Sequence, residues 1–430
     1  MRSAPLVLLL CLGAAVAAAA EAPINVVVVS LDTLRPDHLG CYGYPRATSP
    51  AIDEFRRDAV LFAQAISQAP STLPSHASIF TSLWPRHHDA SQMKQRALAG
   101  RFQTLAEVLR DHGYATASFN GGAQVGKAYG LDQGFDTFSS EHRDDFSATV
   151  GDGLAWLHSR RPAKFFLFLH TYAVHHPYEP DPAKLHAFEP SYFGPLPAAI
   201  SLQLLTAINE GRFAIDERDL THMIAAYDAE IRATDDAFAK LIDGLRRDGL
   251  YDPTMIVLLS DHGEEFREHG RVGWHAHSLY DELLRIALVV KLPAAAHRGA
   301  AVKQQVRAID VAPTVLAAAG IEIPEQFEGV NLLPILDGER IGPLVAFANL
   351  DGGRPIAVRT EEWKLYGRKL FDLANDPGER KDVAAEHPDV SARLKQELRG
   401  MLQKEQAIAA PKARPDRETV ERLKSLGYVH

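Results

Sequence analysis

The sequence predicts an α/β sandwich built around a large, mostly parallel central sheet, with a smaller α+β subdomain towards the C-terminal end. Three observations support this fold class: continuous apolar runs of the buried-strand type, polar side chains directly after each run, and helical patterns between the runs. With 430 residues, the chain is long enough for one large core and a smaller second unit.

The predicted strands are uniformly apolar rather than alternating. Residues 24–31, "INVVVVSL", form a β-branched run of the kind found in strands buried on both faces. Similar runs follow at 164–170 ("KFFLFLH") and 254–260 ("TMIVLLS"). Helical patterns occupy 104–113 and 220–245 between them. This alternation predicts parallel strands joined by helices.

Polar side chains mark the point where each of these runs ends. They are Asp32, His170 and Asp261. In open α/β sheets, ligands bind outside the carboxyl ends of the strands. We therefore expect these three side chains, which are far apart in sequence, to converge at one edge of the sheet.

The N-terminal segment, residues 1–20, has one arginine, a short apolar run and then small residues, which predicts a cleaved secretory signal. A membrane anchor is the alternative, although the run is shorter than a span of about 20 residues requires. We expect a large domain over 22–336, a C-terminal subdomain over 337–430, and a secreted or periplasmic protein without stable membrane insertion. Cys41 is then the only cysteine, so no internal disulfide is expected.

Charge and composition restrict the partners. A net charge of -9 without a basic run gives no electrostatic footprint for nucleic acid, so small-molecule substrates are expected.

The Pro-rich stretch 179–219 is too long for a simple connection. It predicts either a substrate-facing flap or a surface insertion that only packs. The oligomeric state is left open.

The stretch "SDHGEEFREHG" at 260–270 places a carboxylate and an imidazole, Asp261 and His262, at the end of a buried strand. Both are metal-ligand types, and Gly263 allows the backbone to turn tightly. A hydrogen-bonded turn is the alternative for an Asp-His pair. Metal binding gains support from Asp32, which follows another core strand.

The stretch "PSTLPSHAS" at 70–78 precedes an apolar helical pattern, so Ser71 or Thr72 should stand at the helix start. A helix N-terminus attracts anions, and a hydroxyl there is suited to attack the ester of a tetrahedral anion. A plain helix cap is the alternative. A neighbouring divalent ion would make the Thr72 hydroxyl more acidic, which favours Thr72 as nucleophile.

Four motifs together resemble the sulfatases of the alkaline phosphatase superfamily: "VVVVSLDTLRPDHLGCYGYPRATSPAIDEF", "TLPSHASIFTSLWP", "SDHGEEFREHG" and "VRTEEWKLYGRKLFDLANDPGERKDVA". They occur in the family's order, and the similarity runs from Asn25 to the closing "LKSLGYV". The resemblance implies the alkaline-phosphatase/sulfatase-like sandwich, ester hydrolysis and a bound divalent metal ion.

The chain departs from that family at its reacting centre. Thr33 stands where the family has a second aspartate, and Thr72 stands where it has the Cys or Ser that becomes formylglycine. A threonine cannot give that aldehyde, because the methyl on its β-carbon would leave a ketone. Ser71 is one residue out of register, and His76 replaces the family's arginine. The Lys-Trp-His segment of the family is also missing.

The predicted metal ligands are Asp32, Thr72, Asp261 and His262, which resemble one metal site of the superfamily's phosphoester members. An imidazole in place of a carboxylate favours Zn or Mn, while Ca or Mg stays possible.

Histidines supply the remaining candidates. By resemblance, His175 matches the substrate-binding His before Pro, and His277 lies near the family's sulfate-binding Lys. With His76, these are predicted to contact an oxyanion or transfer a proton. A second metal site would need further ligands, which His170, His175, His176, His275 and His277 could supply, and a polar loop or a satisfied core position is the alternative for each single histidine.

The function predicted is hydrolysis of a phosphodiester, phosphonate monoester or sulfate ester by a Thr72 nucleophile, on a small-molecule, glycan or lipid ester. Missing Arg and Lys clamps favour a monoanionic, diester-like substrate. The alternatives are an arylsulfatase-like sulfuric ester hydrolase, a phospho-group transferase, and a non-catalytic binding protein with the same fold.

Overall fold

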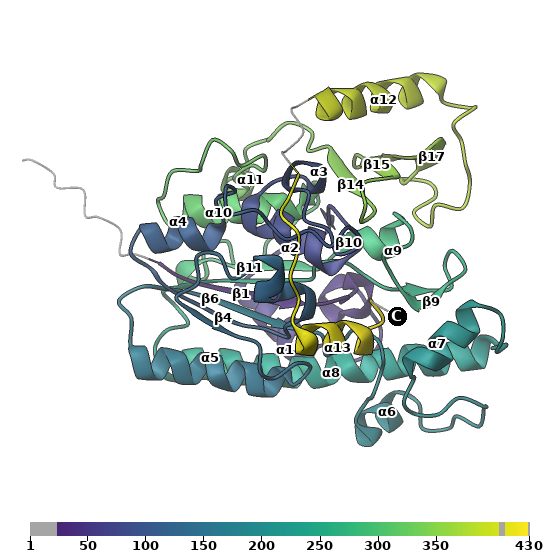
Figure 1. Cartoon of the computed structure of the whole chain (residues 1–430), viewed down its shortest axis with the longest axis horizontal. Helices are drawn as coiled ribbons and strands as arrows, with labels where there is room; N and C mark the ends of the chain where they lie inside the picture. Colours follow the sequence, from purple (N-terminus) through teal and green to yellow (C-terminus); the bar gives the residue numbers. More distant parts are fainter. Residues whose placement is uncertain (1–23, 404–408, 429–430) are drawn as a thin grey trace, which may run out of the picture.

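The computed structural model describes residues 24–403 and 409–428 (Figure 1). The predicted signal at 1–20, which contains the second cysteine of the sequence, Cys11, lies outside the described residues. Within these two ranges, no helix is both long enough and apolar enough to cross a membrane. Cys41 is a free thiol.

An eight-stranded sheet forms the centre of the fold, in the order β12-β2-β11-β7-β1-β6-β4-β5. Its strands are β1 (Asn25–Leu31), β2 (Val60–Phe62), β4 (Ala115–Phe119), β5 (Thr137–Ser139), β6 (Phe165–Thr171), β7 (Thr254–Leu259), β11 (Leu288–Lys291) and β12 (Ala301–Val302). β11 runs antiparallel to both its neighbours, and the other pairs are parallel. The predicted α/β class with a mostly parallel sheet is confirmed, and the three apolar runs are the adjacent strands β7, β1 and β6.

Helices cover both faces of this sheet, so the central strands are buried on both sides. Val26 and Val28 of β1 pack towards α2 (Thr72–Thr81), α4 (Leu105–Asp111) and α10 (Val311–Ala318). Val27 and Val29 pack towards α1 (Pro50–Phe55), α5 (Phe146–Arg160) and α8 (Glu217–Arg247). Figure 1 shows α5 and α8 along one side of the sheet and α4 and α10 along the other. This explains why β1 has no polar alternation.

Both predicted helices are present. α4 follows Thr104, whose side chain forms a capping box with Glu107. α8 begins after Asp216, which forms the same reciprocal cap with Asp219, so it starts earlier than the predicted 220.

The C-terminal region contains an antiparallel sheet covered by a helix, as the sequence predicts. Its elements are β14 (Ala346–Asn349), β15 (Ile356–Arg359), β16 (Trp363–Tyr366), β17 (Lys369–Asp372) and α12 (Pro388–Gln403). The boundary at residue 336 stays a prediction.

Shorter elements connect these units. They are β3 (Ala65–Ile66), β8 (Glu265–Phe266), β9 (Val272–Trp274), β10 (Arg285–Ile286), β13 (Val306–Arg307), α3 (Pro85–His88), α9 (Asp281–Leu284) and α11 (Leu333–Leu336).

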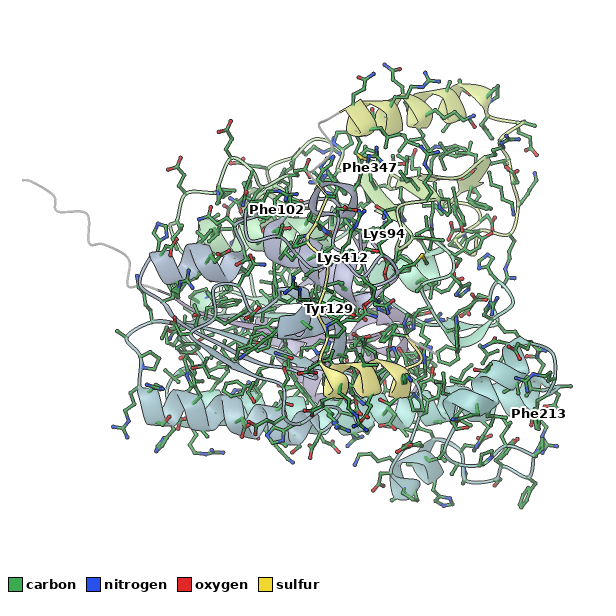
Figure 2. All side chains as sticks on the ribbon, viewed as in Figure 1. Lys94, Phe102, Tyr129, Phe213, Phe347 and Lys412 are labelled. Atoms are coloured by element: carbon green, nitrogen blue, oxygen red, sulfur yellow. The ribbon has the colours of Figure 1, made fainter. Side chains whose placement is uncertain are left out.

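The last described segment, 409–428, returns from the small sheet to the large one. The amide of Ala97 donates to the Pro411 carbonyl at 2.9 Å, and the amide of Ala413 donates to the Gln95 carbonyl at 2.7 Å. Figure 2 labels Lys412 on this tail. The tail then forms α13 (Arg417–Ser425), which ends shortly before Tyr428.

The long stretch 179–219 forms two helices rather than an irregular loop. α6 (Pro182–Phe188) packs against α8, while α7 (Leu202–Asn209) packs beside β9. Figure 1 shows both at one end of the molecule. α6 therefore fits the packing alternative, and α7 lies against the strand that leads to His275.

A buried ion network ties α9 to the C-terminal sheet. Asp281 of α9 accepts from Arg359 Nη2 at 2.8 Å and Lys364 Nζ at 2.9 Å, and Lys364 also donates to Glu379 at 3.1 Å. Burial alone would raise the pKa of Asp281, but Arg359 and Lys364 hold it well below its ordinary value. The carboxylate therefore stabilises the fold only while it is ionised.

We expect Asp281→Ala to lower the free energy of unfolding by about 3–5 kcal/mol, because two buried cations lose their shared partner. Urea denaturation measures this loss. Since the folded-state pKa is lowered, the contribution is complete above pH ~4 and is lost as the pH falls further. Glu54→Ala, which removes an exposed partner of Arg57, is the control and should change little. Equal losses in both variants would contradict the assignment.

Candidate active site

The carboxyl ends of β1, β6 and β7 bring together three polar residues: Asp32 follows β1, His170 lies near the end of β6, and Asp261 follows β7. His170 Nε2 donates to Asp32 Oδ2 at 3.3 Å. Asp32, Asp261 and His262 each place one ligand atom within 4.8 Å of those of the other two. All four side chains are fully buried. The predicted convergence of Asp32, His170 and Asp261 at one edge of the sheet is confirmed.

The two carboxylates have room for a cation. Asp32 Oδ1 and Asp261 Oδ2 accept no hydrogen bond from the described residues, although both are buried. Burial raises the pKa of Asp32 to about 6 and also raises the pKa of Asp261, which lies beside the Asp32 charge. Buried anions without donors are costly unless a cation or proton compensates them. The donor set of two carboxylates and one imidazole therefore fits a divalent metal ion.

His262 is oriented for ligation by its own loop. Its Nδ1 donates to the Gly263 carbonyl at 3.0 Å, which leaves Nε2 facing the carboxylates. Gly263 is needed for space and not for a left-handed turn, because a Cβ there would lie 2.0 Å from the Glu282 carbonyl oxygen. The predicted tight turn is thus replaced by a close backbone approach.

Thr33 stands where the resemblance implies a second aspartate, and it contacts its neighbours through its backbone amide and carbonyl. Its φ of 57° is uncommon for a β-branched residue. The Thr33 amide donates to Asp261 Oδ1 at 3.3 Å, and the Thr33 carbonyl accepts from the Tyr227 hydroxyl at 2.8 Å. The first bond holds the end of β1 against the end of β7, and the second ties it to α8.

Thr72 is the first residue of α2, and its hydroxyl points into the carboxylate cluster. Oγ1 donates to Asp32 Oδ2 at 3.2 Å and lies 3.4 Å from His262 Nε2. Ser71 is the N-cap residue by position, yet its hydroxyl makes no hydrogen bond. Neither hydroxyl caps the helix, so the cap alternative does not describe this site. Gln124 accepts from the Leu73 amide at 2.8 Å and occupies a donor of the first turn instead.

His76 supports the start of α2 from inside the core. Its Nδ1 donates to the Thr72 carbonyl at 2.9 Å, and its Nε2 accepts from the Ser30 hydroxyl at 2.9 Å. Burial lowers the pKa of His76 to about 4, so the ring is neutral. Both ring nitrogens are engaged by protein groups.

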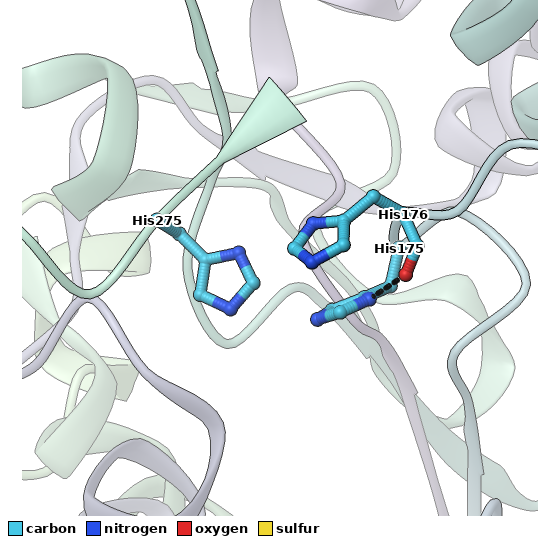
Figure 3. Close-up of side chains that lie close together, drawn as sticks. All are labelled: His175, His176 and His275. Carbon is cyan, nitrogen blue, oxygen red and sulfur yellow. Dashed lines mark hydrogen bonds between the residues drawn. The ribbon is translucent and has the colours of Figure 1, made fainter. Parts of the chain in front are cut away.

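Three further histidines form a second cluster beside the first. His175 and His176 follow β6, His275 follows β9, and one ring nitrogen of each lies within 4.8 Å of the others (Figure 3). His277 is not part of it, because its Nε2 pairs with Glu265 Oε2 at 2.7 Å. Of the two histidines in "GWHAHS", the structure brings His275 and not His277 to the centre.

Tyr428 is a central residue that the sequence analysis missed. Its hydroxyl lies 2.9 Å from Thr72 Oγ1 and 2.9 Å from His175 Nε2. Burial raises the pKa of Tyr428 well above 10, so the phenol stays protonated. The closing "LKSLGYV" was the only signal, and nothing local in it indicates a contact with Thr72.

Comparison with known families gives two matches. Residues 24–321 match the Sulfatase family model, and residues 268–406 match the model for the C-terminal region of N-sulphoglucosamine sulphohydrolase. The first match covers more than half of the chain.

Curated relatives are similar over most of their length. Arylsulfatase K of Rattus norvegicus is 24% identical over 89% of this chain and 78% of its own. The Delta 4,5-hexuronate-2-O-sulfatase of Bacteroides thetaiotaomicron is 23% identical over 87% of each chain.

Solved structures share the fold. The phosphonate monoester hydrolase of Agrobacterium radiobacter superposes with a TM-score of 0.73 at 21% identity, covering 91% of this chain and 100% of its own. A structure in complex with D-glucosamine-2-N,6-O-disulfate gives 0.73 at 19% identity, covering 89% and 98%.

We expect Zn²⁺ or Mn²⁺ to raise the melting temperature of the metal-free protein and EDTA to reverse the effect. At about 100 times the Kd, binding adds about 2.7 kcal/mol to the free energy of unfolding. Asp261→Asn should lose most of the stabilisation from the carboxylate site. Asp235→Asn changes a buried carboxylate that caps α1, and it should keep the full metal response. A full response in Asp261→Asn would contradict this site.

Proposed function

Because the chain belongs to the sulfatase family and is an ester hydrolase, we propose that it cleaves a phosphodiester, phosphonate monoester or sulfate ester with Thr72 as the nucleophile. The observation that carries this proposal is the position of Thr72 Oγ1, which contacts both Asp32 and His262 at the start of a helix. Ser71, the neighbouring hydroxyl, makes no such contact.

Asp32, Asp261, His262 and Thr72 would hold a divalent metal ion. When bound, the ion supplies positive charge that favours ionisation of a hydroxyl and neutralises the transferring group. Zn or Mn suits the mixed imidazole and carboxylate donors better than Ca or Mg.

The chain's own groups can carry the first step. Thr72 Oγ1 gives its proton towards Asp32 Oδ2 and attacks phosphorus or sulfur. The bond to the ester oxygen breaks on the opposite side, and the departing alkoxide takes a proton from water, leaving hydroxide. The product of this step is a covalent ester on Thr72.

In the second step Thr72 is the leaving group, and the attack comes from the opposite side of the phosphorus or sulfur. Hydroxide attacks the phosphorus or sulfur from the side the alcohol has left, and the bond to Thr72 Oγ1 breaks. Thr72 recovers its proton from Asp32, so the two steps together consume one water molecule. Asp32 Oδ2 accepts the hydrogen bond of Thr72 Oγ1, so this oxygen is placed both to take the proton and to return it.

The Tyr428 hydroxyl is suited to stabilise charge on the substrate. The protonated phenol lies between Thr72 Oγ1 and His175 Nε2, so we assign it as a hydrogen-bond donor to a substrate oxygen. His175 faces the same position. His76 holds the backbone of Thr72, and His277, paired with Glu265, is left without a direct part.

Two observations support a substrate class: the charge of the side chains around the site, and the names of the curated relatives. Among the described residues, no Lys or Arg donates a hydrogen bond to Asp32, Thr72, Asp261 or His262, which favours a monoanionic ester over a dianion. A sulfate ester is the second candidate, because the curated relatives compared above are named as sulfatases. A glycan or lipid ester reached in the periplasm or outside the cell fits the N-terminal sequence.

We expect Thr72→Ala to lower kcat/KM by about 10³-fold or more on a nitrophenyl phosphodiester, because a catalytic nucleophile is lost. Thr72→Ser should retain measurable turnover, since it keeps the hydroxyl. Ser71→Ala is the matched control and should remain close to wild type. Loss of turnover in Ser71→Ala but not in Thr72→Ala would contradict the assignment. Phosphonate and sulfate esters run in parallel rank the substrate classes.

Tyr428→Phe removes one hydroxyl and keeps the ring. We expect kcat to fall by about 10²-fold, which is the usual cost of one donor to developing charge, with little change in melting temperature. Tyr192→Phe, whose hydroxyl contacts Asp219 on the flank of the molecule, is the control. A rise in activity of Tyr428→Phe would mean that the phenol blocks the substrate position.

A further inference from the structure

We propose that His175, His176 and His275 bind a second divalent metal ion of the zinc class beside the carboxylate site. Their rings surround a common space in Figure 3, with centroids 4.2 Å (His175–His176), 4.7 Å (His175–His275) and 5.2 Å (His176–His275) apart. All three side chains are buried, on two loops that follow β6 and β9.

The hydrogen bonds engage the same ring nitrogen, Nδ1, in all three histidines. His175 Nδ1 donates to the His176 carbonyl, and His176 Nδ1 donates to Glu264 Oε1 at 2.7 Å. His275 Nδ1 lies 3.3 Å from the same carboxylate oxygen. Nε2 is therefore the ring nitrogen of each histidine that no carboxylate or backbone carbonyl engages. An imidazole held through its other nitrogen by a carboxylate or carbonyl is the usual arrangement of metal-ligating histidines.

Glu264 anchors this arrangement. It is fully buried, and its second oxygen accepts from the Tyr178 hydroxyl. Within the described ranges, no hydrogen bond engages Nε2 of His176 or His275, and Nε2 of His175 meets only the Tyr428 hydroxyl. The Nε2 atoms of the three rings are thus the nitrogens that remain available to an ion at this cluster.

Three imidazole donors with an open fourth position match a catalytic zinc site. Zinc–nitrogen bonds of about 2.0–2.1 Å separate tetrahedral ligands by roughly 3.3 Å. Since the three nitrogens already lie within 4.8 Å of one another, each ring needs to move by about 1 Å or less. Calcium and magnesium prefer oxygen ligands and would be disfavoured here.

The two clusters are close enough to act on one group. The rings of His262 and His275 have centroids 4.6 Å apart. One oxygen atom, the Tyr428 hydroxyl, contacts both Thr72 Oγ1 and His175 Nε2. A substrate oxygen at this point would face both ions, as in two-metal sites with ions ~3.5–4 Å apart. The second ion would supply the positive charge that the missing Lys and Arg residues do not.

A purely structural histidine cluster is the competing explanation. His176 stacks on Trp274 at 5.3 Å with nearly parallel planes, and such packing requires no ion. The two explanations differ in the number of metal ions that the folded protein binds.

The test is a Zn²⁺ titration of the metal-free mature protein by calorimetry, with zinc counted by mass spectrometry after dialysis. We expect two equivalents in wild type, one in His275→Gln, and two in His277→Gln, the matched control two residues away. Asp261→Asn, which damages the carboxylate site, should keep the histidine-site equivalent. Circular dichroism and melting temperature establish that each variant is folded.

One equivalent in wild type, or two in His275→Gln, would overturn the proposal. If His275→Gln does not fold, anomalous diffraction at the zinc edge from wild-type crystals decides: a peak between the three rings is expected, and its absence would also overturn it. Failure of Thr72 as nucleophile would appear in the kinetics of Thr72→Ala and would leave the count of two equivalents unchanged.

Discussion

Two buried carboxylates facing each other at the end of a parallel sheet are the constraint on which the rest of the site depends. Asp32 and Asp261 are fully buried, and each has an oxygen without a hydrogen-bond donor among the described residues. Such a pair is stable only with compensating positive charge. The surrounding features serve to hold it: Thr33 takes up a left-handed backbone, Gly263 admits the Glu282 carbonyl, and His170 donates to Asp32.

The reacting hydroxyl is placed by packing and not by capping. α2 begins at Thr72 and is buried along its entire length, and the hydroxyl of Thr72 faces Asp32, His262 and Tyr428. His76 ties the Thr72 carbonyl to the core from the other side. The C-terminal tail then closes the centre by bringing in Tyr428. Asp32, Thr72 and Asp261 are buried at this centre, where an electrostatic contact is stronger than it would be in bulk water.

The sequence predicted those parts of the fold that local patterns encode. Uniformly apolar runs identified β1, β6 and β7, and the polar residues at the ends of these runs located Asp32, His170 and Asp261. Local sequence patterns did not encode two features of the site, the choice between His275 and His277 and the contact of Tyr428 with Thr72. The choice between His275 and His277 depends on how the turn after β9 faces Glu264 and Glu265, which the spacing alone does not determine. Tyr428 reaches Thr72 through tertiary packing across more than 350 residues of chain, and no local pattern encodes such a contact.

The proposed reaction passes through a covalent ester on Thr72. Its most direct test is to mix the metal-loaded protein with excess phosphodiester, quench with acid during the first turnovers, and map the modified peptide by mass spectrometry. If Thr72 is the nucleophile, we expect a substituted phosphoryl group on Thr72 that disappears as the substrate is exhausted. A modification on any other residue, or none during rapid turnover, would contradict it.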